Sequence, residues 1–332
     1  MASTFSLFSP AELSFAQVPL AHSAATSPPS SSSADPPPLR LDGRSPLQYR
    51  DIVLETGFSH AQGALGSARV VLEDAAGAGG GGATEVVAGV RGEVDDMAQG
   101  SAGGKVIVSL ECAPTALPAL KPDLAQHLAT LLSTLFSPSA LPRPLLSQLV
   151  VLPGSKAWTL HLDVLVLSSA GGNASDAALL AARAALASAR LPATRSIGFD
   201  DAGDATAGGE GMTVDEGFSG LVKGGKSGTK AVDFELVDGG EGGVRLAGWE
   251  DLPVGLTLNL INQLPHLDAT TLEEAASSSQ LLAGFTPSGA VCGLAQLGEG
   301  EVEFARVMPL LSDAGKYAQD LLRTVNAKLR DA

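Results

Sequence analysis

Three carboxylates in the last third of the chain are the side chains best suited to chemistry. Asp268, Glu273 and Glu274 share one short segment, DATTLEEAASSS, just after an apolar stretch. Clustered carboxylates beside the end of a strand can hold Mg²⁺, because hard cations prefer oxygen ligands. The alternative interpretation, which we favour, is a solvated turn or irregular segment with a helix-like start.

Two glycine-rich segments match nucleotide-binding patterns. Residues 77–82 (GAGGGG) fit the dinucleotide fingerprint, but a strand-like TEVVAGV follows where that fingerprint requires the start of a helix. Residues 220–227 (GLVKGGKS) fit the P-loop, with Lys226 as the phosphate lysine, yet no strand enters this segment and no helix leaves it. We therefore expect a hairpin loop at the first segment and no nucleotide site at the second.

Metal-binding and nucleophilic patterns are missing from the sequence. The five histidines show no ligand spacing, and no Gly-x-Ser-x-Gly elbow occurs. The two cysteines, Cys112 and Cys292, are far apart, so they support neither a disulfide framework nor a thiolate metal site. These observations predict no metal, no cofactor and a reducing compartment.

Residues 158–186 predict a strand, a glycine turn and a helix in immediate succession. The strand alternates between apolar and polar positions with a period of two. Its apolar positions are Trp158, Leu160, Leu162 and Val164, and its polar positions are Thr159, His161 and Asp163.

The turn of this unit can present side chains to a ligand. Gly171 and Gly172 permit a sharp reversal, and Asn173 and Ala174 follow them. Either Ser175 or Asp176 is expected to cap an alanine-rich helix over residues 176–190 that packs closely on a sheet.

Other elements are predicted along the whole chain. A capping box, Ser9-Pro10-Ala11-Glu12, predicts a helix over residues 10–18. Apolar periodicity predicts an antiparallel meander of four strands followed by helices, an α+β arrangement, with a long amphipathic helix at the end of the second half. The expected strands are 52–57, 66–73, 84–94, 105–112, 255–261 and 289–296, and the expected helices are 124–136 and 307–329.

Composition divides the chain into five parts. Residues 1–22 are a helix segment and 23–38 a Ser/Pro-rich insert that is expected to be disordered or extended. Residues 198–243, rich in Gly, Asp and Glu, form a long excursion with one brief strand-like segment at 230–237. It separates a first half, residues 39–197, from a second half, residues 244–332.

The overall charge limits the possible partners. The chain has 332 residues, 45% of them apolar, and a formal net charge of -15. It therefore repels a polyanion at long range, so a nucleic-acid role must depend on a local basic patch or on basic partners. The first basic residue is Arg40, and no apolar run is long enough for a membrane span, which predicts a soluble intracellular protein.

Six motifs occur in an order that resembles the RNase PH-like family. They are LRLDGRSPLQYR, ETG, GSARV, TEVVAGVRGEV, WTLHLDVLVLSSAGGNASDA and HLDATTLEEA. The resemblance covers residues 9–329, apart from the Ser/Pro insert, the loop at 77–82 and much of 198–243. It implies an α+β RNase PH fold, similar to domain 2 of ribosomal protein S5, with two β-rich halves and helices packed on the sheets.

The resemblance also implies what the chain does. Active members of the family use inorganic phosphate to cleave the 3′ end of RNA. They bind that phosphate with a tandem arginine pair after the fourth strand and with Ser/Thr-Arg after the Gly-Gly turn. Here residues 114–132 contain Lys121 and no arginine, and Asn173-Ala174 follows the turn. The resemblance therefore implies a catalytically inert subunit, and an active phosphorolytic 3′→5′ exoribonuclease is the alternative.

Within the family, the motifs favour a ring subunit of the RNA exosome, of the 42-type over the 43- or 45-type. The implied partners are other RNase PH-like subunits in a hetero-hexameric ring, RNA-binding cap subunits, a hydrolytic nuclease subunit and single-stranded RNA in the channel. The implied location is the nucleus, including the nucleolus, and the cytoplasm, with roles in rRNA maturation and mRNA turnover.

Some residues can be assigned expected roles by the resemblance. Lys121 lies where some relatives place RNA-contacting arginines, and Asp268 and Glu274 are expected to form a vestigial carboxylate site. Three arginines, Arg44, Arg50 and Arg69, are expected near interfaces, and fold-stabilising ion pairs are the favoured explanation for them.

Overall fold

The computed structural model describes residues 8–25, 40–57, 63–73, 82–97, 103–116, 122–197, 233–237, 243–261, 264–298 and 300–331. The P-loop-like segment 220–227, Lys121, residues 77–81 and residues 26–38 of the Ser/Pro insert lie outside the described residues. The described part of the chain has no helix that is long and apolar enough to cross a membrane.

The first half is built on one large sheet whose strand order is β1-β2-β3-β6-β4, with β5 paired to β6. Its strands are β1 (Ile52–Thr56), β2 (Gly66–Leu72), β3 (Thr84–Asp96), β4 (Lys105–Cys112), β5 (Val150–Leu152) and β6 (Lys156–Ser169). The predicted strands are confirmed, but the predicted four-strand meander is wrong. The long strand β6 lies between β3 and β4 and pairs with β4 in parallel. Because β6 has a continuous buried apolar face, it takes this central position in the sheet.

Helix α4 (Ala174–Ser188) crosses one face of this sheet and is almost completely buried. Alanine predominates in it, so the helix backbone can approach the strands closely. The approach is close at Gly66, where an added Cβ would lie 2.6 Å from the carbonyl oxygen of Ala185 and 2.5 Å from the Cα atom of Ala189, which follows the helix. The alanine-rich sequence therefore determines the distance between the helix and the sheet.

Replacement of Gly66 by Ala is expected to lower the free energy of unfolding by about 1–3 kcal/mol, because the new methyl group meets backbone atoms that cannot rotate away. Gly315 is the matched control. An added Cβ there would lie 3.5 Å from the Phe285 ring, in ordinary contact, within a helix. Gly315→Ala is expected to stabilise the chain by about 0.5–1 kcal/mol. Urea unfolding of both variants checks this pair, and equal effects would contradict it.

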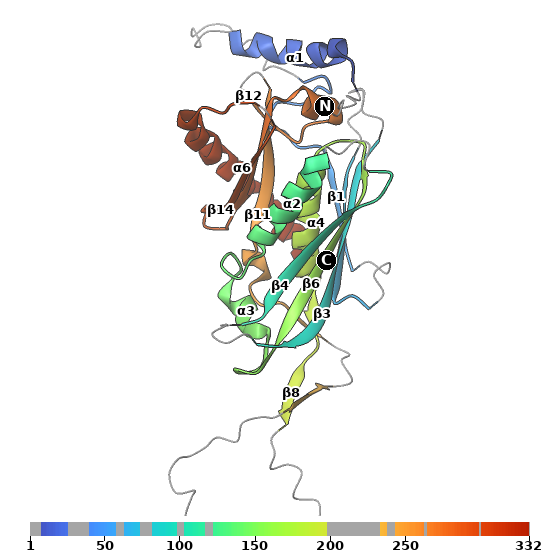
Figure 1. Cartoon of the computed structure of the whole chain (residues 1–332), viewed down its shortest axis with the longest axis vertical. Coiled ribbons are helices and arrows are strands. Elements are labelled where there is room, and N and C mark those ends of the chain that lie inside the picture. The colour runs from blue at the N-terminus through green and yellow to red at the C-terminus, as the bar shows by residue number, and fades with distance from the viewer. Residues whose placement is uncertain are drawn as a thin grey trace, which may run out of the picture.

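The second half is a four-stranded antiparallel sheet of order β12-β11-β13-β14. Its elements are β11 (Val254–Ile261), β12 (Leu264–Leu267), α5 (Thr271–Ala276), β13 (Ser279–Phe285), β14 (Val291–Leu297) and α6 (Phe304–Asp331). Helix α2 (Pro122–Leu135) packs on both β4 and β14, while α4 packs on β11, so helices connect the two sheets (Figure 1). Strands β12 and β13 were not predicted. All of β13 is buried, so it lacks the alternation that marks a half-exposed strand.

Short elements complete the described chain. Helix α1 (Pro10–Ala25) packs on α5 through Ala16, Leu272 and Ala276. It continues past the predicted end at residue 18 into the segment expected to be disordered, because the alanine-rich residues there favour a helix. The remaining elements are α3 (Arg143–Gln148), β7 (Arg190–Leu191), β8 (Thr194–Ile197), β9 (Asp233–Leu236), β10 (Val244–Arg245) and a 3₁₀ turn, η3 (Trp249–Asp251).

The strand-like segment predicted at residues 230–237 is present as β9. It pairs antiparallel with β8, so the chain leaves and returns along one two-stranded ribbon. In Figure 1 this ribbon projects from the lower end of the body. The division of the chain into five parts stays a prediction.

Candidate functional site at the Gly171–Gly172 turn

The turn between β6 and α4 places Asn173 at the start of the helix. Asn173 adopts the left-handed conformation, with φ 57°, and its side chain does not cap the helix. The predicted cap by Ser175 or Asp176 is also absent. The Asp176 carboxylate instead accepts hydrogen bonds from the Tyr49 hydroxyl at 2.7 Å and from Asn173 Nδ2 at 3.2 Å. The polar groups of this turn therefore point into the protein.

Asp268 is the centre of the polar network around the turn. It follows β12 with φ 47° and is fully buried. Its Oδ1 accepts from Arg50 Nη2 and from Asn173 Nδ2, both at 2.8 Å. Its Oδ2 accepts from Arg44 Nη1 at 2.7 Å and from Arg50 Nε at 2.9 Å. Both oxygens are thus occupied by groups of the same chain.

Charge pairing keeps Asp268 ionised despite its burial. Burial alone would raise the pKa of the carboxyl, but the hydrogen bonds and positive charges of Arg50 and Arg44 outweigh it, and the pKa is lowered. The pKa of Arg50 is raised: burial opposes this change, but the pairing with Asp268 is stronger. Asp268 therefore acts as the counter-ion of two arginines.

The other two predicted carboxylates have separate partners. Glu273 forms a buried ion pair with Arg40, which also donates to the carbonyl oxygens of Leu267 and Asp268. The Glu274 carboxylate accepts the backbone N–H of Asn173 at 2.9 Å. Among the described residues, no three His, Cys, Asp or Glu side chains are arranged to hold a metal ion.

The favoured expectation of a solvated turn at these carboxylates is wrong. The segment forms helix α5, whose N-terminus is closed by a capping box between Thr270 and Glu273. Asp268 and Glu273 are both buried, and only Glu274 is partly exposed. The helix could have been predicted, because the sequence TTLEEA carries the capping pattern. The arginine partners could not, because they lie far away in the sequence.

Helix α5 covers the Gly171–Gly172 turn. A Cβ added to Gly172 would lie 2.5 Å from the backbone nitrogen of Thr271, so the two segments touch. Arg50 donates to the carbonyl oxygens of Gly171 and Gly172, at 2.8 and 3.3 Å. The N-terminus of a helix attracts an anion, and at α4 the Glu274 carboxylate takes that position. The turn is therefore closed by groups of this chain.

The arginines selected from the sequence make intramolecular ion pairs. Arg44 and Arg50 pair with Asp268, and Arg69 bridges Glu55 and Glu85 on the neighbouring strands. The predicted ion pairs of these arginines are confirmed. Lys121 lies outside the described residues, so its expected contact with RNA stays a prediction. Three members of the network, Arg40, Tyr49 and Asn173, received no specific role from the sequence, although all three lie in the quoted motifs.

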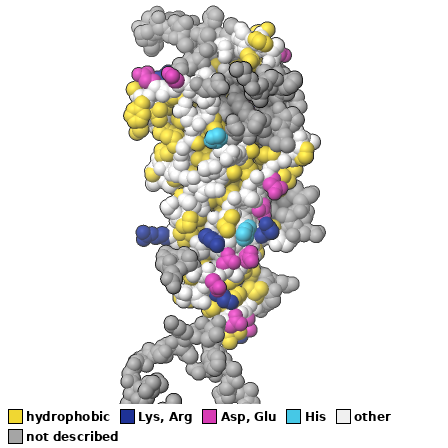
Figure 2. Space-filling view, in the orientation of Figure 1, with side chains coloured by type: hydrophobic (Ala, Val, Ile, Leu, Met, Phe, Trp, Pro, Cys, Tyr) yellow, Lys and Arg dark blue, Asp and Glu magenta, His cyan; other side chains and the backbone are white. Residues whose placement is uncertain are grey.

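Exposed charges on the first sheet also occur in pairs. Arg91 pairs with Asp163, Lys105 with Asp95, and His161 lies 3.5 Å from Glu93. Figure 2 shows basic and acidic side chains close together over the lower part of the body. Arg91 and Lys105 are thus partly neutralised by neighbouring acids, so they do not form a strongly basic surface for phosphates on this sheet.

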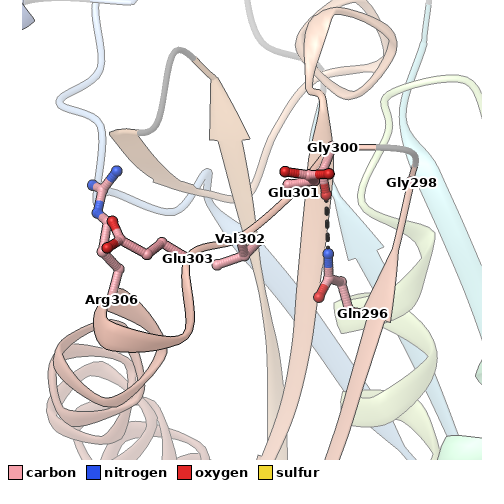
Figure 3. A pocket seen from close by; sticks show the side chains of 7 residues that line it. All are labelled: Gln296, Gly298, Gly300, Glu301, Val302, Glu303 and Arg306. Carbon is pink, nitrogen blue, oxygen red and sulfur yellow. Dashed lines mark hydrogen bonds between the residues drawn. The ribbon is translucent and has the colours of Figure 1, made fainter.

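A separate cavity of about 900 Å³ lies at the start of α6 (Figure 3). Glu301, Glu303 and Arg306 line it, and Gln296 Nε2 donates to the carbonyl oxygen of Gly300 at 3.0 Å beside it. This open, mostly acidic cavity shares no lining residue with the Gly171–Gly172 turn.

Comparison with known proteins agrees with this architecture. Residues 48–192 match the RNase PH family, which is described as the 3′ exoribonuclease family, domain 1. A solved archaeal exosome core has a chain that covers 95% of this one, with 96% of its own length matched, at 20% identity and a TM-score of 0.62. The predicted α+β RNase PH fold is confirmed by this similarity.

Three curated relatives show the same similarity in sequence, each carrying the name exosome complex component Rrp42. The protein of Sulfurisphaera tokodaii is 36% identical over 46% of this chain and 53% of its own length, so that match spans about half of the relative. The protein of Methanothermobacter thermautotrophicus is 25% identical over 87% of this chain and 90% of its own. The protein of Schizosaccharomyces pombe is 29% identical over 80% and 77%. Residues 48–192 therefore match a domain of the RNase PH family, and most of the chain is similar to Rrp42 proteins.

Proposed function

We propose that this chain is a structural ring subunit of an RNA exosome, of the 42-type, that supports 3′→5′ RNA processing and degradation without cutting RNA itself. The observation that carries the proposal is the closed turn. The backbone N–H of Asn173, at the N-terminus of α4, is bonded to the Glu274 carboxylate, and Asn173-Ala174 stands where active relatives have Ser/Thr-Arg. Rrp42 proteins are named as exosome components among the relatives, which supports the assignment to a ring.

The missing arginines and the closed turn argue against phosphorolysis for the same physical reason. Each charge-assisted hydrogen bond to phosphate is worth roughly 1.5–3 kcal/mol. Loss of two removes about 3–6 kcal/mol of binding in the transition state, which corresponds to roughly two to four decades in rate. In addition, a phosphate at the turn would have to displace Glu274, whose charge has the same sign.

The acidic balance of the chain indicates how it would contribute to an RNA channel. With a formal net charge of -15, it needs more basic neighbours to hold most of the phosphates. The proposed partners are the other RNase PH-like chains of a hetero-hexameric ring, RNA-binding cap subunits and a hydrolytic nuclease subunit, with single-stranded RNA in the channel. A location in the nucleus, including the nucleolus, and the cytoplasm belongs to the same proposal.

Native purification of the tagged chain is the test of the ring. Mass spectrometry of the intact complex is expected to give the other RNase PH-like chains in equal amounts. A homo-oligomer or a lone monomer would contradict the proposed ring. The same preparation also tests the subunit type. If this chain is of the 42-type, the 43- and 45-type subunits are expected in the complex as two other chains.

An assay of the isolated chain tests catalytic inertness. Single-stranded RNA incubated with the chain is expected to yield no nucleoside diphosphate in phosphate buffer, because the phosphate cradle is missing. Sulfate buffer provides the control for an effect of ionic strength. Release of nucleoside diphosphates that depends on phosphate would instead establish the alternative, an active phosphorolytic exoribonuclease.

A further inference from the structure

Strand β14 is an open edge of the second sheet without the features that usually protect such an edge. Native proteins protect edges with charges, prolines or very short strands, because free N–H and C=O groups otherwise pair with another strand. At the other edges, β1 carries Glu55, β4 carries Lys105 and Glu111, and the short strand β12 contains Pro265. Strand β14 (VCGLAQL) has no charge and no proline, and no strand of the described chain pairs with its outer edge (Figure 1).

Two apolar side chains of β14 lie on the side of the sheet that faces helix α6. The Phe285 ring marks this side, because a Cβ added to Gly315 of α6 would lie 3.5 Å from it. Val291 pairs with Phe285, and Leu294 pairs with Ala283, two residues before Phe285. Both therefore share the side of Phe285. Val291 is 44% and Leu294 is 48% exposed, so α6 covers them only in part.

The first turns of α6 add two more exposed apolar side chains. Phe304 is 85% and Met308 is 67% exposed, and they lie about one turn apart. Ser312, one turn further along, lines a hollow of about 290 Å³ together with Gly289 of the loop before β14. The cavity of about 900 Å³ at the start of α6 is lined by Gln296, near the other end of β14 (Figure 3). Hollows thus lie beside α6 at both ends of this strand.

We propose that the outer edge of β14, together with Val291, Leu294, Phe304 and Met308, binds an extended segment of a neighbouring RNase PH-like subunit, which adds a strand to the second sheet. We call this area the β14 surface. An extended segment fits because it supplies backbone hydrogen bonds along the whole edge, while apolar side chains at alternate positions contact Val291 and Leu294. The proposal rests on the proposed function, which supplies the neighbouring subunit.

The charges around the β14 surface indicate what the segment carries. Glu301 and Glu303 are exposed and line the cavity at one end of the surface. Because opposite charges meet across interfaces, we expect a Lys or Arg at the matching end of the segment. The same two glutamates repel the phosphates of RNA, so the surface favours a protein partner.

A lysine placed on the β14 surface tests the proposal. Leu294→Lys introduces a protecting charge on β14, and Ile107→Lys is the control on β4, where the native side chain is 43% exposed. Because both positions are exposed, both variants are expected to keep the natural urea midpoint. In native purification of the tagged full-length chain, Leu294→Lys is expected to recover one RNase PH-like neighbour about tenfold less than the natural chain does. Ile107→Lys is expected to recover it unchanged.

The outcomes separate the β14 surface from the proposed function. If the natural chain recovers no RNase PH-like neighbour, the proposed ring is contradicted. If the natural chain recovers its neighbours and Leu294→Lys recovers them equally, the β14 surface alone is overturned. An equal loss in Leu294→Lys and Ile107→Lys would also overturn it, and so would a homodimer of the natural chain that Leu294→Lys dissociates.

Hydrogen exchange of the natural chain supplies a measurement that needs no variant. The backbone amides of residues 291–297 are expected to exchange about tenfold more slowly in the purified complex than in the isolated chain, because a partner strand covers the edge. Unchanged exchange in a complex that contains the neighbours would overturn the proposal. Equal protection by single-stranded RNA added to the isolated chain would overturn the choice of a protein partner.

Discussion

Replacement of Asp268 by Asn is expected to lower the free energy of unfolding by about 3–5 kcal/mol, because it leaves the buried Arg50 without its counter-ion and removes one of the two carboxylates that pair with Arg44, the other being Asp42. Arg44 and Arg50 have side chains that are 11% and 3% exposed, so water cannot replace the lost carboxylate. Urea or thermal unfolding of the purified chain measures the effect. Arg50 also holds the carbonyl oxygens of the Gly171–Gly172 turn, so the loss is expected to loosen that turn.

Asp163→Asn is the control for this prediction. Asp163 also accepts hydrogen bonds from an arginine, Arg91, but its side chain is 42% exposed and that of Arg91 is 67% exposed. An exposed pair is worth about 0–1 kcal/mol, so this variant is expected to change stability little. Equal losses in the two variants would contradict the assigned role of Asp268. Because the pKa of Asp268 is lowered in the folded chain, its contribution is present above the unfolded value near 4 and is lost as the pH falls through the folded pKa.

Asp176 is expected to give the opposite dependence on pH. Complete burial, with a smaller contribution from the negative charge of Asp268, raises its pKa from 3.8 to about 7, although hydrogen bonds from Tyr49, Thr257 and Asn173 oppose the rise. The folded chain therefore retains a proton that the unfolded chain releases. The contribution of Asp176 is fully present below pH 4 and declines as the pH rises to about 7. The decline is on the order of 4 kcal/mol.

Asp176→Asn removes this titration and keeps an oxygen that can accept from Tyr49. The variant is expected to flatten the stability profile between pH 4 and 7 and to be more stable than the natural chain at pH 8. Chemical denaturation at several pH values measures both effects. The Asp163→Asn control removes a surface carboxylate instead and is expected to retain most of the natural slope. A slope that persists in Asp176→Asn would assign the titration to another group.

Local patterns were enough to predict most of the fold. The alternation in β6, the glycine turn and the alanine-rich helix α4 were all readable from the sequence, because their periods and turn residues lie within a few positions of one another. The order of strands was not readable, because the parallel pairing of β6 with β4 depends on long-range contacts. Strand β13 was missed for a related reason: both of its faces are buried, so its sequence shows no alternation.

The site was only partly predictable. The sequence singled out Asp268, Glu273 and Glu274 as a group, but the burial and the charge partner of each carboxylate depend on residues elsewhere in the chain. Arg40 meets Glu273 across 233 positions, and Arg50 meets Asp268 across 218. The sequence DATTLEEA gives no indication that arginine side chains of the N-terminal segment contact it in the folded chain. The fold class could therefore be predicted from short-range patterns, whereas the state of the site could not.

The pairing of the segment around Arg40, Arg44 and Arg50 with the segment around Asp268 also has a consequence for synthesis. Chains emerge from the ribosome N-terminus first, and contacts between distant segments form slowly because a long loop must close before they do. The contacts of the three arginines with Asp268 and Glu273 can form only after more than two hundred further residues have been synthesised. A product truncated before residue 268 would lack the counter-ions of Arg40 and Arg50, while Arg44 would keep Asp42, and the Gly171–Gly172 turn and the face of α4 that packs on β11 would be uncovered. The buried ion pairs of the N-terminal segment can therefore form only after the second half of the chain has been synthesised.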